Sequence, residues 1–167
     1  MIVYNIILSS NIYYMNQVIK GAIAENYVAC ELSRRGHNSF RIGAVGEIDV
    51  ITTGGIRVEV KSSSGTKENG KGLRYYSFSL NPRQTEEVPW VGRKSDYCIC
   101  LGFSDDYSRV IFALCVPTYL VSKLSNGSPE RIKEGYCSLG ISCRNGVVEM
   151  GKDNPYISYL NNWDIIK

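Results

Sequence analysis

The chain has 167 residues, of which 44% are hydrophobic and 21% charged, as in an ordinary soluble protein with a single domain. Lys and Arg number 19 against 16 Asp and Glu, a net charge of +3 that excludes a Lys/Arg-dominated architectural protein and an acidic solvating chain. This mild excess permits nucleic acid as a partner without demanding it.

The elements begin with an apolar stretch, 1–14, that favours an added strand, or an appendage if Met15 is the true start. Apolar residues then recur at helical spacing from Asn16 to Arg35, and Gly36 supplies a stop. Further on, Asn81-Pro82 predicts the start of a helix that runs to Val88. Strands are predicted at 38–42, 46–52, 56–62, 74–80, 96–103, 109–116, 138–142 and 146–150, with a short helix at 117–124 and an aromatic turn or helix at 156–164.

This order predicts an α/β fold, a mixed β-sheet flanked by helices. We expect one domain over 1–167, with a core at about 16–124 and a C-terminal extension at 125–167 that could serve dimerisation or target recognition. No apolar run approaches the roughly 18 residues of a membrane-spanning helix. Because the start lacks the features of a signal peptide and the six cysteines form no CxxC pair, we expect reduced thiols and a cytoplasmic protein.

The most informative stretch is the hairpin formed by 46–52 and 56–61 around the turn Thr53-Gly54-Gly55. A three-residue loop makes the numbers of opposed residues sum to 108, which sets Ile48 opposite Val60 and Val50 opposite Val58 on one apolar face. On the other face this register sets Asp49 opposite Glu59, and Glu47 opposite Lys61. A two-residue loop would split the apolar set, so the hydrophobic pattern selects the register.

Like charges directly opposed in a hairpin repel, at about 5 Å by on the order of 3 kcal/mol. A shared proton or a bridging divalent cation would relieve this repulsion between Asp49 and Glu59. Carboxylates, a hard cation and the neighbouring Lys61 are together suited to phosphodiester hydrolysis. The alternative is an exposed Glu47–Lys61 ion pair with no chemical role.

A wider pattern spans residues 16–118 and consists of Lys20, Gly21, Glu25, Leu32, Gly36, Gly46, Asp49, Glu59 and Lys61. This pattern resembles that of the PD-(D/E)xK nuclease superfamily, including archaeal Holliday-junction resolvases and small restriction or homing-type endonucleases.

The resemblance implies a restriction-endonuclease-like fold and a Mg²⁺-dependent nuclease in which Mn²⁺ substitutes. It implies that Asp49 and Glu59 bind the metal, that Glu25 adds a carboxylate from the helix, and that Lys61 assists the attacking water. Gln84 is expected near the site. Glu47 departs from the pattern and is either an outer ligand or a structural partner of Lys61.

Positive charge is concentrated at 57–94, which holds eight basic and four acidic residues. The polar loop after the candidate site predicts DNA contacts by Lys67, Lys71 and Arg74, and Arg83 follows in the next helix.

Three functions remain open. The leading one is a DNA endonuclease, acting as a homodimer because one such site cuts one strand, and either resolvase-like or a double-strand-cutting restriction or homing enzyme. The second is a non-catalytic DNA-binding module with the same fold. The third is a nuclease that acts on RNA.

Overall fold

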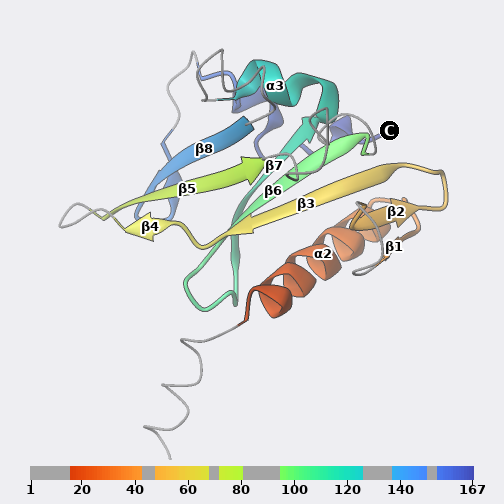
Figure 1. Cartoon of the computed structure of the whole chain (residues 1–167), viewed down its shortest axis with the longest axis horizontal. Coiled ribbons are helices and arrows are strands. Elements are labelled where there is room, and N and C mark those ends of the chain that lie inside the picture. The colour runs from red at the N-terminus through yellow and green to blue at the C-terminus, as the bar shows by residue number, and fades with distance from the viewer. Residues whose placement is uncertain (1–15, 43–47, 68–71, 81–94, 126–136, 150–153) are drawn as a thin grey trace, which may run out of the picture.

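A computed structural model describes residues 16–42, 48–67, 72–80, 95–125, 137–149 and 154–167, which form two β-sheets and one long helix (Figure 1). The first sheet has the order β1-β2-β3-β6-β7. Its strands are β1 (Ser39–Arg41), β2 (Val50–Thr52), β3 (Arg57–Ser63), β6 (Tyr97–Phe103) and β7 (Val110–Pro117). It is mixed, because β3 and β6 are parallel whereas its other neighbours are antiparallel.

Helix α2 (Gln17–Arg34) covers one face of this sheet, as Figure 1 shows. Its start is capped by the side chain of Asn16, which accepts a hydrogen bond of 2.9 Å from the N–H of Val18. Its end is set by Gly36, whose φ of 90° is a conformation that glycine adopts without steric cost. Ala24, Val28 and Leu32 are four residues apart, so they share one buried face. The predicted helix is confirmed.

The β2–β3 hairpin has the predicted register. Val50 pairs with Val58 and Ile51 with Arg57, so the numbers sum to 108. The loop closes through a hydrogen bond of 3.0 Å from the N–H of Thr52 to the carbonyl of Ile56. Val50 and Val58 are both fully buried in the core beneath α2, which is why the apolar pattern could select this pairing.

A second sheet covers the other face of the first, with the order β4-β5-β8-β9 and antiparallel pairing throughout. Its strands are β4 (Thr66–Lys67), β5 (Leu73–Leu80), β8 (Cys137–Arg144) and β9 (Val147–Val148). Strand β5 alternates, and its buried residues Tyr76, Phe78 and Leu80 pack against the first sheet. The expected mixed sheet is thus flanked by α2 on one face and, within the described residues, mainly by a second sheet on the other.

The described residues after 125, which are 137–149 and 154–167, are an integral part of both cores. Strand β8 pairs with β5 along its whole length. The short helices η3 (Ile157–Tyr159) and η4 (Trp163–Ile165) follow, and Trp163 and Ile166 pack into the core beneath α2. The earlier short helices η2 (Thr118–Leu120) and α3 (Val121–Leu124) occupy the predicted place after β7.

Two predicted elements, the N-terminal strand at 1–14 and the helix at 82–88, lie outside the described residues. Within the described part, no helix has both the length and the apolar character required to cross a membrane.

One close contact between the central strands leads to a stability prediction. Gly102 on β6 faces Phe112 on β7, and a Cβ added at Gly102 would lie 2.2 Å from the Phe112 ring. Phe112 is held in turn by edge-to-face contacts with Tyr76 and Phe78, so it has little room to retreat. We expect Gly102→Ala to destabilise the protein by about 2 kcal/mol, a fall in melting temperature of roughly 4–8 °C.

Thermal unfolding followed by circular dichroism measures this effect. Gly54→Ala is the matched control, because a Cβ there would meet only the Thr52 hydroxyl at an ordinary 3.7 Å. Equal melting temperatures for the two variants would show that the Phe112 ring can move.

Candidate active site

Asp49 lies immediately before β2 and is fixed against β3 by two hydrogen bonds. Its N–H donates to the carbonyl of Val58 at 3.1 Å. Its carboxylate Oδ2 accepts from the N–H of Val60 at 2.7 Å, which is the peptide group linking Glu59 to Val60. The Asp49 carboxylate therefore lies beside the strand that carries Glu59 and Lys61.

The pKa of Asp49 is raised above its ordinary value of 3.8, mainly because burial disfavours the charged carboxylate. The negative charge of Glu25 raises it further, whereas the Val60 N–H and the cations Lys61 and Arg41 act in the opposite direction. Asp49 is thus an acid held in a partly desolvated place close to another carboxylate, as is frequent at functional sites.

Glu59 and Lys61 form a close pair on β3. The Lys61 Nζ lies 2.5 Å from Oε1 of Glu59, whose side chain is only 7% exposed. Their partners on β6 are Cys98 and Cys100, which belong to the core between the two sheets. The pair therefore faces the second sheet, whereas Val58 and Val60 face α2.

Lys61 remains a cation at neutral pH. Burial lowers its pKa, but the charge of Glu59, the hydrogen bond to Glu59 and the charge of Asp49 outweigh burial, so the pKa lies above its ordinary 10.5. This ammonium can stabilise negative charge on a phosphate, and it cannot take a proton from water.

The carboxylates of Asp49 and Glu59 have different partners in the structure. The Asp49 carboxylate accepts a backbone N–H, and the Glu59 carboxylate accepts the Lys61 ammonium. Each acid thus has its own partner. Strand register could not reveal this, because it fixes which backbones are opposed but not which donors the side chains reach.

Glu25 approaches the same region from α2. Its carboxylate pairs with Arg41, at the end of β1, and its charge acts on Asp49. The structure therefore places Glu25 near Asp49 where α2 meets the β2–β3 hairpin, whereas the Glu59–Lys61 pair lies farther along β3 on the side of the second sheet. The charge of Lys61 acts on Asp49 and so links the two groups. The sequence did not predict that Glu25 pairs with Arg41, because the two residues are 16 positions apart and a turn lies between them.

The chemistry of this set suits a hard cation such as Mg²⁺, because the available donors are carboxylate oxygens. Among the described residues, however, no three acidic, histidine or cysteine side chains form a ready-made metal cluster. Mg²⁺ commonly binds through one or two carboxylates, waters and substrate phosphates, so the Asp49 and Glu59 carboxylates have the chemistry of a partial ligand set. Glu47, Gln84, Lys71 and Arg83 lie outside the described residues.

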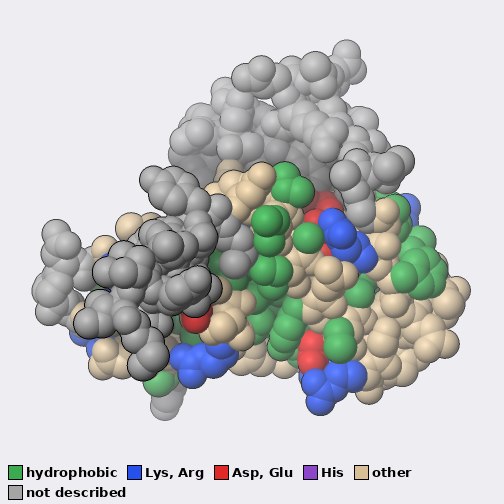
Figure 2. Space-filling view, turned by 90° about the horizontal axis from the view of Figure 1, so that it is seen from below, with side chains coloured by type: hydrophobic (Ala, Val, Ile, Leu, Met, Phe, Trp, Pro, Cys, Tyr) green, Lys and Arg blue, Asp and Glu red, His purple; other side chains and the backbone are tan. Residues whose placement is uncertain are grey.

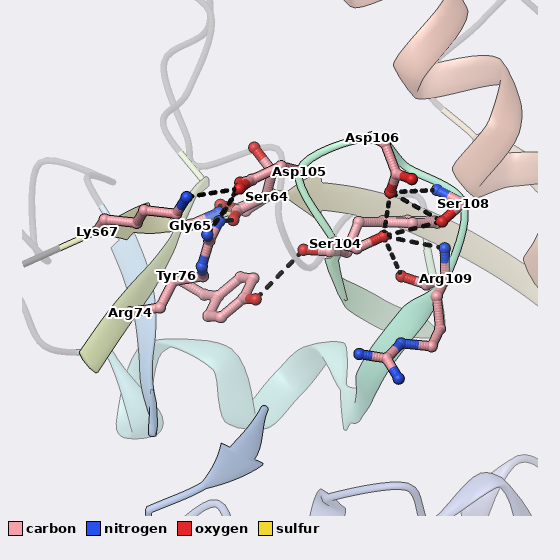
Figure 3. Close-up of polar contacts among 12 residues, drawn as sticks. Ser64, Gly65, Lys67, Arg74, Tyr76, Ser104, Asp105, Asp106, Ser108 and Arg109 are labelled. Atoms are coloured by element: carbon pink, nitrogen blue, oxygen red, sulfur yellow. Dashed lines mark hydrogen bonds and ion pairs between the residues drawn. The ribbon is translucent and has the colours of Figure 1, made fainter. Parts of the chain in front are cut away.

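The two described cations that we expected to contact DNA, Lys67 and Arg74, both pair with Asp105, in the loop between β6 and β7 (Figure 3). Arg74 donates from Nη2 to Asp105 at 2.9 Å and from Nη1 to the carbonyl of Ser64 at 2.6 Å. The Arg74 hydrogen bonds and, second, Lys67 lower the pKa of Asp105 to about 2 despite some burial. The Arg74 side chain is only 17% exposed, so it is held by the protein, whereas Lys67 is 73% exposed.

Sequence reasoning missed Asp105, because its partners lie 31 and 38 positions earlier and on the other sheet. Other described cations are also paired, including Arg57 with Asp96. Figure 2 shows the same pattern on one face of the molecule, where basic side chains lie beside acidic ones and hydrophobic side chains separate the groups. The excess of positive charge at 57–94 is therefore partly neutralised where the structure describes it.

Of three comparisons with known proteins, only the one with solved structures finds a similar protein. A scan against protein-family models and a search of curated proteins both find no match. Among solved structures, the chain is similar to a bacterial homing endonuclease, I-Ssp6803I, with a TM-score of 0.52 and 17% identity over 92% of each chain. The chain thus has an endonuclease-like mixed α/β fold. This likeness includes most of the segment after residue 125, in agreement with its integral place in the cores.

Proposed function

We propose that this protein is a DNA endonuclease that hydrolyses phosphodiester bonds with Mg²⁺, for which Mn²⁺ substitutes. The observation that carries the proposal is the arrangement on the β2–β3 hairpin, where the partly desolvated Asp49 carboxylate binds the N–H of Val60 and lies within reach of the charge of Lys61, which pairs with the buried Glu59. Three ionisable groups, of which Glu59 is buried and Asp49 and Lys61 are half-buried, are costly to hold partly out of water, and such groups are concentrated at functional sites.

Each residue has a distinct role in the proposal. Asp49 and Glu59 hold the metal, and Glu25 adds negative charge from α2. Lys61, a cation at neutral pH, neutralises charge that develops on the phosphate and orients the attacking water. The metal, when bound, lowers the pKa of a water and polarises the phosphate.

The likeness to a homing endonuclease supports a double-strand-cutting enzyme, because it extends over the C-terminal segment that a minimal resolvase core would lack. One such site cuts one strand, so the proposed active form is a homodimer. A resolvase-like enzyme, which is also dimeric, is the second candidate, and a non-catalytic DNA-binding module is the third.

A cleavage assay tests this function. Purified protein is incubated with supercoiled plasmid, linear duplex, single strands and a four-way junction, each with Mg²⁺, Mn²⁺ or EDTA. We expect duplex cleavage with either metal and none with EDTA. Selective, symmetric cutting of the junction would favour the resolvase, and DNA binding without any cutting would favour the non-catalytic module.

Two variants accompany this assay. Asp49→Asn is expected to lose cleavage, and Asp164→Asn, which removes a carboxylate that is 90% exposed on η4, is expected to retain it. Cutting in EDTA, or undiminished cutting by Asp49→Asn, would refute the proposed mechanism.

A further inference from the structure

A pocket of about 290 Å³ lies at the end of the two sheets, beside the loop that joins β6 to β7. It is lined mainly by polar residues from both sheets, among them Arg74, Tyr76, Ser104, Asp105, Arg109 and Asn145. Pockets for drug-sized ligands begin at about this volume, so the space suits a small polar group rather than a base pair.

The loop beside this pocket, 104–109, has a fixed shape. The N–H of Ser104 donates to the carbonyl of Arg109 at 2.9 Å, and the N–H of Arg109 donates back to the Ser104 hydroxyl at 3.1 Å. Asp106 accepts from the hydroxyls of Ser104 and Ser108 at 2.7 and 2.8 Å. Tyr107 adopts a φ of 57° and stacks on Phe103 at 4.6 Å. Arg109 is therefore presented by an ordered backbone.

The Arg109 guanidinium is not neutralised by the acids of its own loop. Asp105 is engaged by Arg74 and Lys67, and Asp106 by the two serines. In the described part of the chain no ion pair or hydrogen bond involves this guanidinium, and Figure 3 shows it directed away from the loop's polar contacts. The pocket thus has two guanidinium groups and one carboxylate, an excess of one positive charge.

The pocket is close to the candidate active site. Ser64, whose carbonyl binds Arg74, follows Lys61 by three residues, which is a rise of about 10 Å along an extended strand. Lys61 and the pocket residue Tyr76 both face the space between the sheets. Since a DNA strand rises about 3.4 Å per nucleotide, 10 Å corresponds to about three nucleotides.

We infer that this pocket binds a backbone phosphate of the DNA near the scissile one, and that the Arg109 guanidinium is the cation that holds it. The inference rests on the proposed function, because it takes DNA as the ligand. Arg74, already bound to Asp105, forms the wall of the pocket and steers the phosphate toward Arg109.

The test measures the salt dependence of binding. The Kd for a 30-base-pair duplex is measured in EDTA by fluorescence anisotropy, between 50 and 200 mM salt. Loss of one phosphate contact lowers the slope of log Kd against log salt by about 0.9. Between 50 and 200 mM salt, the factor by which Kd rises is therefore expected to be roughly threefold smaller for Arg109→Gln than for the wild type. Arg109→Lys keeps the charge and is expected to keep the slope.

Lys123→Gln is the matched control. It removes one exposed positive charge from α3, which Figure 1 shows at the opposite end of the molecule from the β6–β7 loop. An unchanged slope for Arg109→Gln, or an equal fall for Lys123→Gln, overturns the inference. If the wild type nevertheless cuts DNA with Mg²⁺, the proposed function stands and only the pocket assignment fails.

A second arm distinguishes DNA from a free phosphate compound. Deoxyadenosine monophosphate and inorganic phosphate are titrated while the melting temperature is recorded. Stabilisation by either compound that requires Arg109, together with unaltered duplex binding by Arg109→Gln, would assign the pocket to a small phosphorylated ligand and overturn the DNA assignment.

Discussion

Asp49→Asn is expected to abolish metal-dependent cleavage and at the same time to make the protein more stable. In the wild type, burial and Glu25 both disfavour the charged form of this carboxylate. Asn keeps an oxygen that can accept the Val60 N–H, and it removes the charge. Such a change at a functional site gains on the order of 1 kcal/mol, a rise in melting temperature of about 2–4 °C.

The expected loss of activity is much larger. A metal that stabilises the transition state contributes several kcal/mol, and about 4 kcal/mol corresponds to a roughly 10³-fold fall in rate. Added Mg²⁺ is expected to raise the melting temperature of the wild type and to leave that of Asp49→Asn unchanged, because only a bound ligand stabilises the folded state. A lower melting temperature for Asp49→Asn would contradict the argument.

The stability difference between Asp49→Asn and the wild type depends on pH in a defined direction. Because folding raises the pKa of Asp49, the folded protein binds a proton at this carboxyl more tightly than the unfolded chain does. The stabilisation of the fold by this proton is complete below the unfolded pKa of about 3.8, and it is lost as pH rises through the folded pKa. The advantage of Asn over Asp is therefore absent at low pH and reaches a plateau above the folded pKa. Urea unfolding of both proteins across this range measures it.

Lys61→Met is expected to cause the largest loss of stability among these variants. It leaves the Glu59 carboxylate, whose side chain is 7% exposed, without the ammonium that neutralises it. Breaking a fully buried pair costs about 3–5 kcal/mol. Because the Lys61 side chain is 30% exposed, we expect about 2–3 kcal/mol, a fall in melting temperature of roughly 4–12 °C.

A double variant separates charge from packing. Glu59→Gln combined with Lys61→Met removes both charges, so it is expected to recover most of the stability while cleavage stays lost. Lys61→Arg, which keeps a cation, is the conservative control for stability. A double variant that is no more stable than Lys61→Met would show that the cost came from lost packing of the lysine stem.

The β2–β3 hairpin could be predicted because its determinants are local. Alternation of apolar residues around Thr53-Gly54-Gly55 admits one pairing that buries all the valines, and that pairing places Asp49 beside β3. The limits of α2 were equally accessible, because the Asn16 cap and Gly36 act within one turn of the helix. Such preferences depend only on residues that are neighbours in the sequence.

The partners of the charged groups could not be predicted in the same way. Arg74 and Lys67 are bound by an acid on the other sheet, and Glu25 by an arginine beyond the end of its helix. Loop conformation and sheet stacking decide these pairs, since a side chain binds whichever opposite charge the assembled fold brings near. The excess of basic residues therefore did not reveal how much positive charge the protein leaves unpaired.

The sequence by itself determined helix α2, the described strands other than β4, the register of the hairpin and the place of Asp49 beside β3. Only the tertiary structure decided that a second sheet covers the first, that the C-terminal residues complete both cores, and that Asp105 takes two of the cations expected to bind DNA. The physical reason is the range of the interactions. Alternation and capping act over a few residues, whereas burial and charge pairing depend on segments that meet only when the chain is folded.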